Sequence, residues 1–261
     1  MQLPSLDKKA RTVVLASVKQ ALRLCNLPLP ETEPELGRYY GYPSYEVRWG
    51  TYRLLIRDGD YRIWHLTKHN HASPTGQVET GSRARLNALA QALGVRVAGT
   101  VLKARRCQGT LVLATWWPAV PENYPAEVQL ASLTLDTRAQ QVVGFQLGPC
   151  LAPVSPTKKQ RLSQAAALLL ARQFFQQPLR PPRDGSSPAA SLAYVAQSTP
   201  MTESEARQRL QSLGKILPSA PPSVTPVVLR LAWIVRDDWQ SISLDVETGK
   251  LLAIADNGPK S

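Results

Sequence analysis

At 261 residues with 43% hydrophobic content, the chain is long enough to bury an ordinary core, and its 19% charged content is low. The formal net charge is +12, of which residues 1–117 carry +9 (17 Lys/Arg against 8 Asp/Glu). Such a balance favours polyanionic partners of the first half, unless the arginines only cover exposed strand faces. Three cysteines without CxxC spacing exclude a disulfide scaffold; they are Cys25, Cys107 and Cys150.

The N-terminal sequence does not predict export. Lys19 and Arg23 interrupt the apolar run that a secretory signal would need, and no other run is long enough to cross a bilayer. We therefore expect a cytoplasmic protein without a transmembrane segment.

The first predicted unit, residues 1–70, is a helix followed by an antiparallel meander. Apolar residues recur at helical spacing between residues 6 and 25, and alternation predicts strands at 45–49, 52–57 and 61–66. Asp58-Gly59 provides a hairpin turn between the last two strands. This unit is basic and rich in aromatic residues.

The second predicted unit, residues 82–150, repeats this order. Ser82 is the expected N-cap of a helix that ends at Leu93-Gly94, and strands follow at about 95–106, 109–117, 128–136 and 141–147.

The remaining chain is divided by proline. An extra helix is predicted within residues 155–177, opened by Ser155-Pro156. The proline-rich stretch 178–200 indicates a linker. The third unit, residues 201–258, is expected to begin with a helix at Thr202 and to continue with a strand at 227–235 and a hairpin at 239–254.

Two stretches align without a gap. Residues 132–145 read SLTLDTRAQQVVGF and residues 241–254 read SISLDVETGKLLAI. In each, apolar alternation leads to an aspartate (Asp136 or Asp245), a polar turn follows, and a second apolar run closes the match. A repeated strand–turn–strand unit predicts an α+β protein made of tandem units, each with one helix packed on an antiparallel β-meander.

The last unit resembles the PepSY family of interaction and inhibitor modules. The resemblance is carried by LRLAWIVRDDWQSISLDVETGKLLA at 229–253 and is clearest for residues 200–256; its positions here are Ala232, Trp233, Trp239, Asp245, Thr248, Gly249 and Leu251. It implies a PepSY/cystatin-like fold, no catalytic residue, and an extracytoplasmic or peptidase-regulating role of the kind seen in YpeB-type repeat proteins.

Candidate chemistry is sparse. No nucleophile motif, P-loop or dinucleotide fingerprint occurs, so we expect no enzyme activity and no cofactor. His65, His69 and His71 are spaced HxxxHxH, a weak metal pattern that incidental loop histidines explain better.

The basic, aromatic first half offers the best candidate surface. Arginines interleave with aromatic residues on its strands, and Trp64, which shares a strand face with Arg62, is the ring expected to be most exposed. Trp116-Trp117 should place one indole in the core and one on the surface. The predicted binding residues are Arg48, Arg53, Arg57, Arg62, Trp64, Arg105, Arg106 and Trp117.

These features lead to a non-catalytic protein-binding or scaffolding subunit of a larger assembly, with strand edges available for augmentation. Nucleic-acid binding through the basic first half is the alternative, and a PepSY-type envelope role is a second alternative that depends on the resemblance alone.

Overall fold

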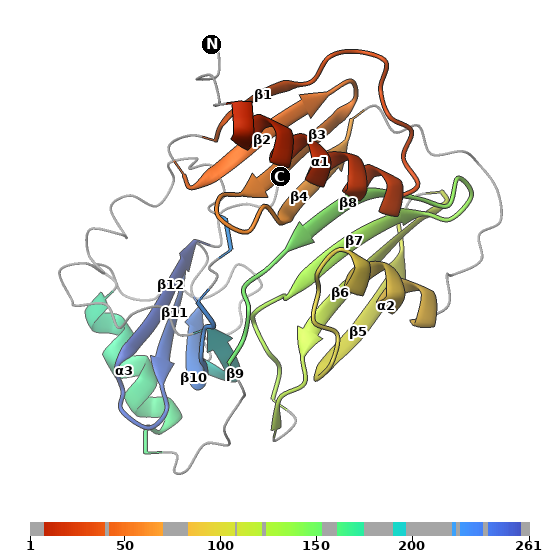
Figure 1. The fold of residues 1–261 in the computed structure, drawn as a ribbon. Helices are drawn as coiled ribbons and strands as arrows, with labels where there is room; N and C mark the ends of the chain where they lie inside the picture. The colour runs from red at the N-terminus through yellow and green to blue at the C-terminus, as the bar shows by residue number, and fades with distance from the viewer. Residues whose placement is uncertain are drawn as a thin grey trace. The chain divides into compact units, whose positions relative to one another are not determined.

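The computed structural model shows an α+β protein with a large antiparallel sheet and few helices (Figure 1). It describes residues 8–39, 42–69, 83–107, 109–121, 124–152, 161–174, 190–196, 221–222, 225–236 and 240–256. The chain divides into two compact units: unit 1 comprises residues 1–119, 129–149 and 218–224, and unit 2 comprises residues 120–128, 150–217 and 225–261.

Unit 1 contains an eight-stranded sheet in the order β1-β2-β3-β4-β8-β7-β6-β5. Each half is a four-stranded antiparallel meander, and the two halves meet through their last strands, where Leu66 pairs with Phe145. The elements of this unit are α1 (Lys8–Leu24), β1 (Glu35–Arg38), β2 (Ser44–Trp49), β3 (Tyr52–Arg57), β4 (Ile63–Lys68), α2 (Arg83–Ala92), β5 (Thr100–Arg106), β6 (Leu111–Pro118), β7 (Ala131–Asp136) and β8 (Gln141–Leu147).

The two helices of unit 1 lie across the same face of the sheet (Figure 1) and end in the same way. After α1, Asn26 adopts a φ of 54° and the amide of Leu27 donates to the carbonyl of Leu22; after α2, Gly94 has a φ of 90° and the amide of Val95 donates to the carbonyl of Ala90. Both are Schellman-type ends, in which a left-handed residue lets the chain turn back onto the helix.

One hydrophobic core joins both halves of unit 1. It contains Val14 and Val18 of α1, Leu86 of α2, and strand residues such as Trp116 and Phe145 from both meanders. The end of α1 also bonds to the second meander, because the amide of Val142 donates to the carbonyl of Cys25. The first two helix-and-meander segments are therefore parts of one folding unit.

Unit 2 contains a four-stranded antiparallel sheet in the order β12-β11-β10-β9, with α3 packed on it. Ala167 and Ala171 of α3 are fully buried against this sheet, and the Trp233 indole donates to the carbonyl of Leu162 at 2.7 Å. The elements are α3 (Gln164–Phe174), β9 (Ala190–Ala196), β10 (Leu229–Arg236), β11 (Gln240–Asp245) and β12 (Leu251–Asp256).

Two expectations from the sequence are wrong, and one strand was not predicted. No element was predicted for the segment 35–38, which forms β1, and residues 190–196 of the expected linker form β9. Residues 161–163 are not helical, because the amides of Arg161 and Leu162 bond to the carbonyl of Val246, and α3 begins after Ser163, whose hydroxyl accepts from the amide of Ala166. The helix expected at Thr202 lies outside the described residues.

Three hairpins, β3–β4, β7–β8 and β11–β12, have the same irregularity at the same place. In each hairpin the pairing register shifts by one residue near the end of the first strand, between its third-last and its second-last residue. The second strand therefore contains one extra, unpaired residue, a β-bulge. The shifts follow the pairs Leu55↔His65, Thr134↔Gly144 and Ser243↔Ala253, and the next pairs are Ile56↔Ile63, Leu135↔Val142 and Leu244↔Leu251.

The turns of these hairpins also match. The residue two positions before the resumed pairing has a positive φ in each: 54° at Tyr61, 57° at Gln140 and 71° at Gly249. Such a φ is unstrained only for glycine, which the third hairpin has. The first hairpin, whose sequence shows only a generic turn, thus shares the register shift and the left-handed position with the two that align in sequence, although its Gly59, with a φ of 98°, has no left-handed counterpart in them.

Buried aspartates close the second and third turns. Oδ1 of Asp136 accepts from the amides of Arg138 and Ala139 at 3.0 and 3.1 Å, and Oδ1 of Asp245 accepts from those of Glu247 and Thr248 at 2.9 and 2.8 Å. A threonine hydroxyl adds a further bond in each turn, Thr110 to Asp136 and Thr248 to Asp245. Both carboxylates are almost fully buried, so these bonds satisfy groups that water does not reach.

Asp136→Ala and Asp245→Ala should each lower the free energy of unfolding by about 2 kcal/mol, because each leaves buried turn amides without their charged acceptor. Urea denaturation followed by circular dichroism measures the loss. Gln140→Gly, which gives the second turn the glycine of the third, should instead leave stability unchanged or raise it by up to about 1 kcal/mol. A loss below about 0.5 kcal/mol on removing either aspartate would contradict the role assigned to the carboxylate.

Candidate protein-binding surface

The predicted binding residues of unit 1 mostly belong to the face of the eight-stranded sheet that points away from α1 and α2. We call it the helix-distal face. Its members are fixed by the register, since they pair with one another and alternate with core residues such as Ala114 and Trp116. It includes Glu46, Arg48, Arg53, His65, Thr67, Val101, Lys103, Arg105, Thr115 and Trp117.

Two of the predicted arginines are held by a buried acid. Oε1 of Glu46, a side chain only 1% exposed, accepts from Nε of Arg48 at 3.0 Å and from Nε of Arg53 at 2.7 Å. The pairing satisfies a carboxylate that burial would otherwise penalise strongly. It also fixes both guanidinium groups close to the sheet and lowers the net charge of the cluster to +1.

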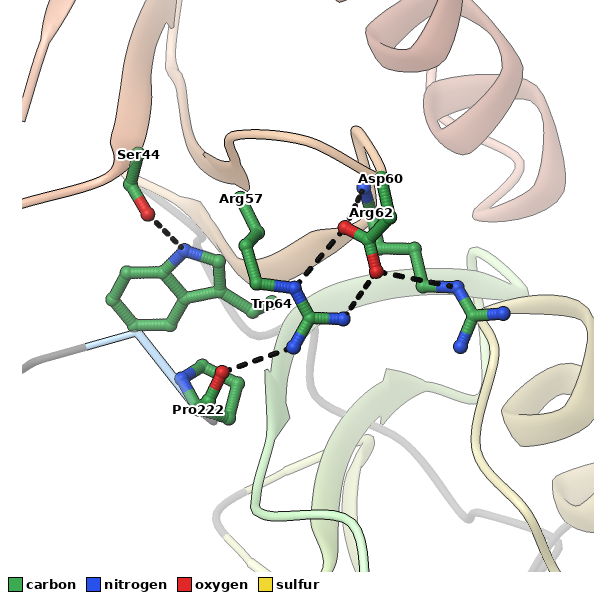
Figure 2. A network of polar contacts seen from close by, with 6 residues as sticks. All are labelled: Ser44, Arg57, Asp60, Arg62, Trp64 and Pro222. Carbon is green, nitrogen blue, oxygen red and sulfur yellow. Dashed lines mark hydrogen bonds and ion pairs between the residues drawn. The ribbon is translucent and has the colours of Figure 1, made fainter. Parts of the chain in front are cut away.

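The aromatic residues of the first meander form cores instead of a stacking platform. Tyr45, Trp49 and Tyr52 belong to the main core, and Tyr39 and Trp64 form a small cluster with Leu55 on the other side of the sheet. Trp64 was expected to be the most exposed ring. This prediction is wrong, because Trp64 is only 2% exposed. Its indole donates to the Ser44 hydroxyl at 3.3 Å (Figure 2).

The bulge in β4 places Trp64 on the helix-distal face, where Tyr39 and Leu55 bury it. The expected face followed strict alternation with Arg62, but Trp64 is the extra residue of the β4 bulge, between His65 paired with Leu55 and Ile63 paired with Ile56. A bulge resets which side chains share a face.

Arg57 is also buried, whereas Arg62 is exposed. Figure 2 shows the Arg57 guanidinium between Asp60 and the carbonyl of Pro222, with Arg62 on the far side of the same carboxylate. Nε of Arg57 donates to Oδ1 of Asp60 at 3.1 Å, a second donor bonds to Oδ2, and Nη1 donates to the Pro222 carbonyl oxygen at 2.9 Å. This guanidinium is therefore engaged within unit 1.

The other predicted residues gather at the edge of the sheet. β5 is the terminal strand of the sheet (Figure 1). Most of its residues are exposed, among them Lys103, Arg105 and Arg106. On the neighbouring strand Trp116 is fully buried and Trp117 is half-buried, as the alternation predicts. The Lys103 ammonium lies 5.1 Å from the centre of the Trp117 ring, within cation–π range, and the Trp117 indole donates to the Thr115 hydroxyl at 2.9 Å.

The histidines do not form a metal centre within the described residues, where no group of three or more potential ligands occurs. Nε2 of His65 lies 2.8 Å from the Thr67 hydroxyl, His69 is exposed, and His71 lies outside the described residues. Burial lowers the pKa of His65, and the charges of Arg53 and His69 lower it further.

The cysteines are unpaired thiols. Cys107 and Cys150 are exposed, whereas burial raises the pKa of Cys25 to about 12. A thiol with such a pKa stays protonated at neutral pH and is a poor nucleophile.

Comparisons with known proteins leave the function open. No protein-family model matches the sequence, and no curated protein is significantly similar to it. Among solved structures, the "Bacillus megaterium YpeB C-terminal domain" is similar over 97% of this chain and 98% of that chain, at 9% identity and a TM-score of 0.41. A similarity this weak carries no argument about function. In the part of the chain that the structure describes, no helix has the length and apolarity that crossing a membrane requires.

Two features of the surface were missed by the sequence reasoning. The exposed edge of β5 depends on strand order, which no local pattern gives. The contact between Arg57 and Pro222 joins residues that are 165 positions apart. The Pro221-Pro222 dipeptide marks an extended segment in the sequence, but it does not indicate which residue this segment contacts.

Acid should destabilise unit 1 through Asp58 and Asp60. The pKa of Asp58 is lowered, because hydrogen bonds from Arg38 and Tyr45 outweigh the effect of burial. Burial alone would raise the pKa of Asp60, but the hydrogen bonds from Arg57 and from the Arg62 amide are stronger, so this pKa is lowered too. As pH falls, the unfolded chain is protonated first, so this stability is complete above about pH 5 and is lost as pH falls through about 4 and below.

Urea titrations at a series of pH values measure this decline. Asp58→Asn and Asp60→Asn should each lower stability at pH 7 and flatten the acid limb. Glu33→Gln, at an exposed side chain, is the control and should leave the curve unchanged. An acid limb as steep in both asparagine variants as in the parent would contradict the assignment.

Proposed function

We propose that this chain is a non-catalytic protein-binding module that takes up an extended, acidic segment of another protein along the open edge of β5. The observation that carries the proposal is the seven-residue terminal strand itself, exposed along most of its length and basic. An added strand gains main-chain hydrogen bonds along such an edge, and cross-strand side chains give selectivity.

The ladder with β6 tells which groups a partner strand would meet. The amide of Cys107 donates to the carbonyl of Leu111, and the amide of Ala119 donates to the carbonyl of Gly99. In an antiparallel pair bonded residues alternate, so the odd-numbered residues of β5 direct their main-chain groups toward β6. The amides of Leu102 and Ala104 are therefore directed toward the open edge.

The charges of β5 select the partner. Lys103 and Arg105 share the helix-distal face with Trp117, and exposed Val101, 47% accessible, adds apolar surface to it. Lysines and arginines on an edge strand repel a second copy of the same edge. A strand with acidic residues at the cross-strand positions would compensate these charges and cover the Trp117 ring.

Nucleic-acid binding is the weaker candidate. The first half is basic, but the tyrosines and tryptophans of the first meander, which were to stack on bases, are mostly buried. Half-buried Trp117 is the ring of the predicted binding set that retains exposure.

We also propose that the protein was built from copies of one helix-and-meander unit. The matching bulges and turns of the three hairpins support this, as does the identical ending of α1 and α2. In such a protein binding specificity arises where one copy departs from the others.

Ala104→Pro should abolish partner binding without unfolding the sheet. The substitution removes an amide directed to the open edge and leaves the bonds to β6 in place, which is where proline is tolerated in strands. Parallel affinity isolations from native extracts, with the parent, Ala104→Pro and Ala104→Ser as baits, identify the partner as the protein lost only with the proline variant. If every protein held by the parent is held equally by Ala104→Pro, the edge is not the binding site.

Lys103→Glu with Arg105→Glu should weaken binding of the isolated partner at least tenfold, since both cations face the proposed acidic strand. Titration calorimetry between 50 and 300 mM salt separates the two candidates. A protein partner held by main-chain bonds keeps most of its affinity over this range, whereas a polyanionic nucleic acid loses affinity by orders of magnitude. Tight, steeply salt-dependent binding to single-stranded nucleic acid would replace the proposal.

A further inference from the structure

The first hairpin differs from the other two at one decisive position. Arg57 occupies the place that Asp136 and Asp245 hold in the second and third hairpins, directly before the turn and one residue after the register shift. A guanidinium cannot accept the turn amides that these aspartates accept. In the first hairpin the turn carboxylate comes from Asp60, and its Oδ1 accepts from a different main-chain amide, that of Arg62, at 3.1 Å.

This exchange leaves a positively charged donor at the base of the turn. Asp60 engages Nε and one terminal nitrogen of Arg57 and so fixes the plane of the guanidinium. The remaining terminal nitrogen, Nη1, is aimed at the carbonyl oxygen of Pro222, 2.9 Å away (Figure 2). The Arg57 side chain is only 11% exposed, so the bond forms where water competes little.

Proline is a suitable partner for such a donor. It lacks a main-chain N–H and cannot extend a β-ladder, but its carbonyl remains a strong acceptor and its fixed φ keeps the chain extended. Pro221 and Pro222 are half-buried and cluster with unit 1, although 160 residues separate Pro222 from Arg62 at the end of the turn.

We propose that the first hairpin is a binding site for the main-chain carbonyl of an extended proline segment, and that its ligand in this chain is Pro221–Pro222. Arg57 is the donor and Asp60 positions it. The second and third hairpins lack this site, because each has an aspartate at the position of Arg57. The inference is independent of the proposed binding edge at β5.

The experiment converts the first turn into the pattern of the third. Arg57→Asp with Asp60→Thr reproduces the arrangement of Asp245 and Thr248, so the hairpin keeps a means of closing while the carbonyl of Pro222 loses its donor. Nitroxide labels at Thr51→Cys, in the exposed turn between β2 and β3, and at Ser219→Cys, two positions before the Pro221–Pro222 dipeptide in the sequence, report the distance by electron paramagnetic resonance, in a chain with Cys107→Ser and Cys150→Ser.

With Arg57 present, we expect one narrow distance distribution. The converted variant should broaden it at least twofold, with circular dichroism unchanged, and Arg57→Lys, which loses the fork geometry, should show intermediate broadening. Arg62→Ala, which removes an exposed neighbour of Asp60, should leave the distribution narrow. A distribution that stays narrow in the converted variant overturns the proposal. If the converted variant does not fold, the Arg57→Lys variant provides the test. A distance distribution that stays narrow in Arg57→Lys then overturns the proposal as well.

Discussion

The pairing of β4 with β8 is the interaction on which unit 1 depends. Each four-stranded meander has one helix and one apolar face. Alone, such a small unit would bury too little apolar surface to form a stable core. Joined edge to edge at Leu66 and Phe145, the two meanders form one sheet whose apolar face both helices cover. The junction also removes two of the four strand edges that separate meanders would expose, so β1 and β5 become the terminal strands.

This constraint explains what the sequence could predict. Helices α1 and α2 and most strands of unit 1 follow from local apolar spacing, because each packs one stripe or one face on the core. The order of the strands does not, since β4 and β8 come together over a gap of 73 residues between Lys68 and Gln141, which also bond through their side chains. β9 was not predicted, because its residues belong to the stretch 178–200, whose proline content indicates a linker.

The turns illustrate the same limit at the scale of single residues. The aspartates at 136 and 245 were visible as a repeat because both kept the same chemistry. The first hairpin has the same register shift but different side chains: Arg57 stands at the position of the aspartate, and Tyr61, stacked on Tyr45 at 6.2 Å, occupies the left-handed position. A residue other than glycine in the left-handed conformation costs about 1–2 kcal/mol, but this shared backbone feature is not marked by a glycine in the first or the second hairpin. The prediction for Trp64 failed for a related reason, because strict alternation shows neither the bulge in β4 nor the cluster with Tyr39 and Leu55 that buries this ring on the helix-distal face.

The electrostatics of the basic half follow from where its acids lie. Glu46, Asp58 and Asp60 are few, but each lies against two or more donors, so Arg38, Arg48, Arg53 and Arg57 are all held by carboxylates. The positive charge of the sequence is thus largely compensated across the first meander. On β5, which reads TVLKARR, Lys103 lies against an aromatic ring instead. The fold thus places three cations on an exposed terminal strand, and we propose that a partner binds at this edge and not on the aromatic meander.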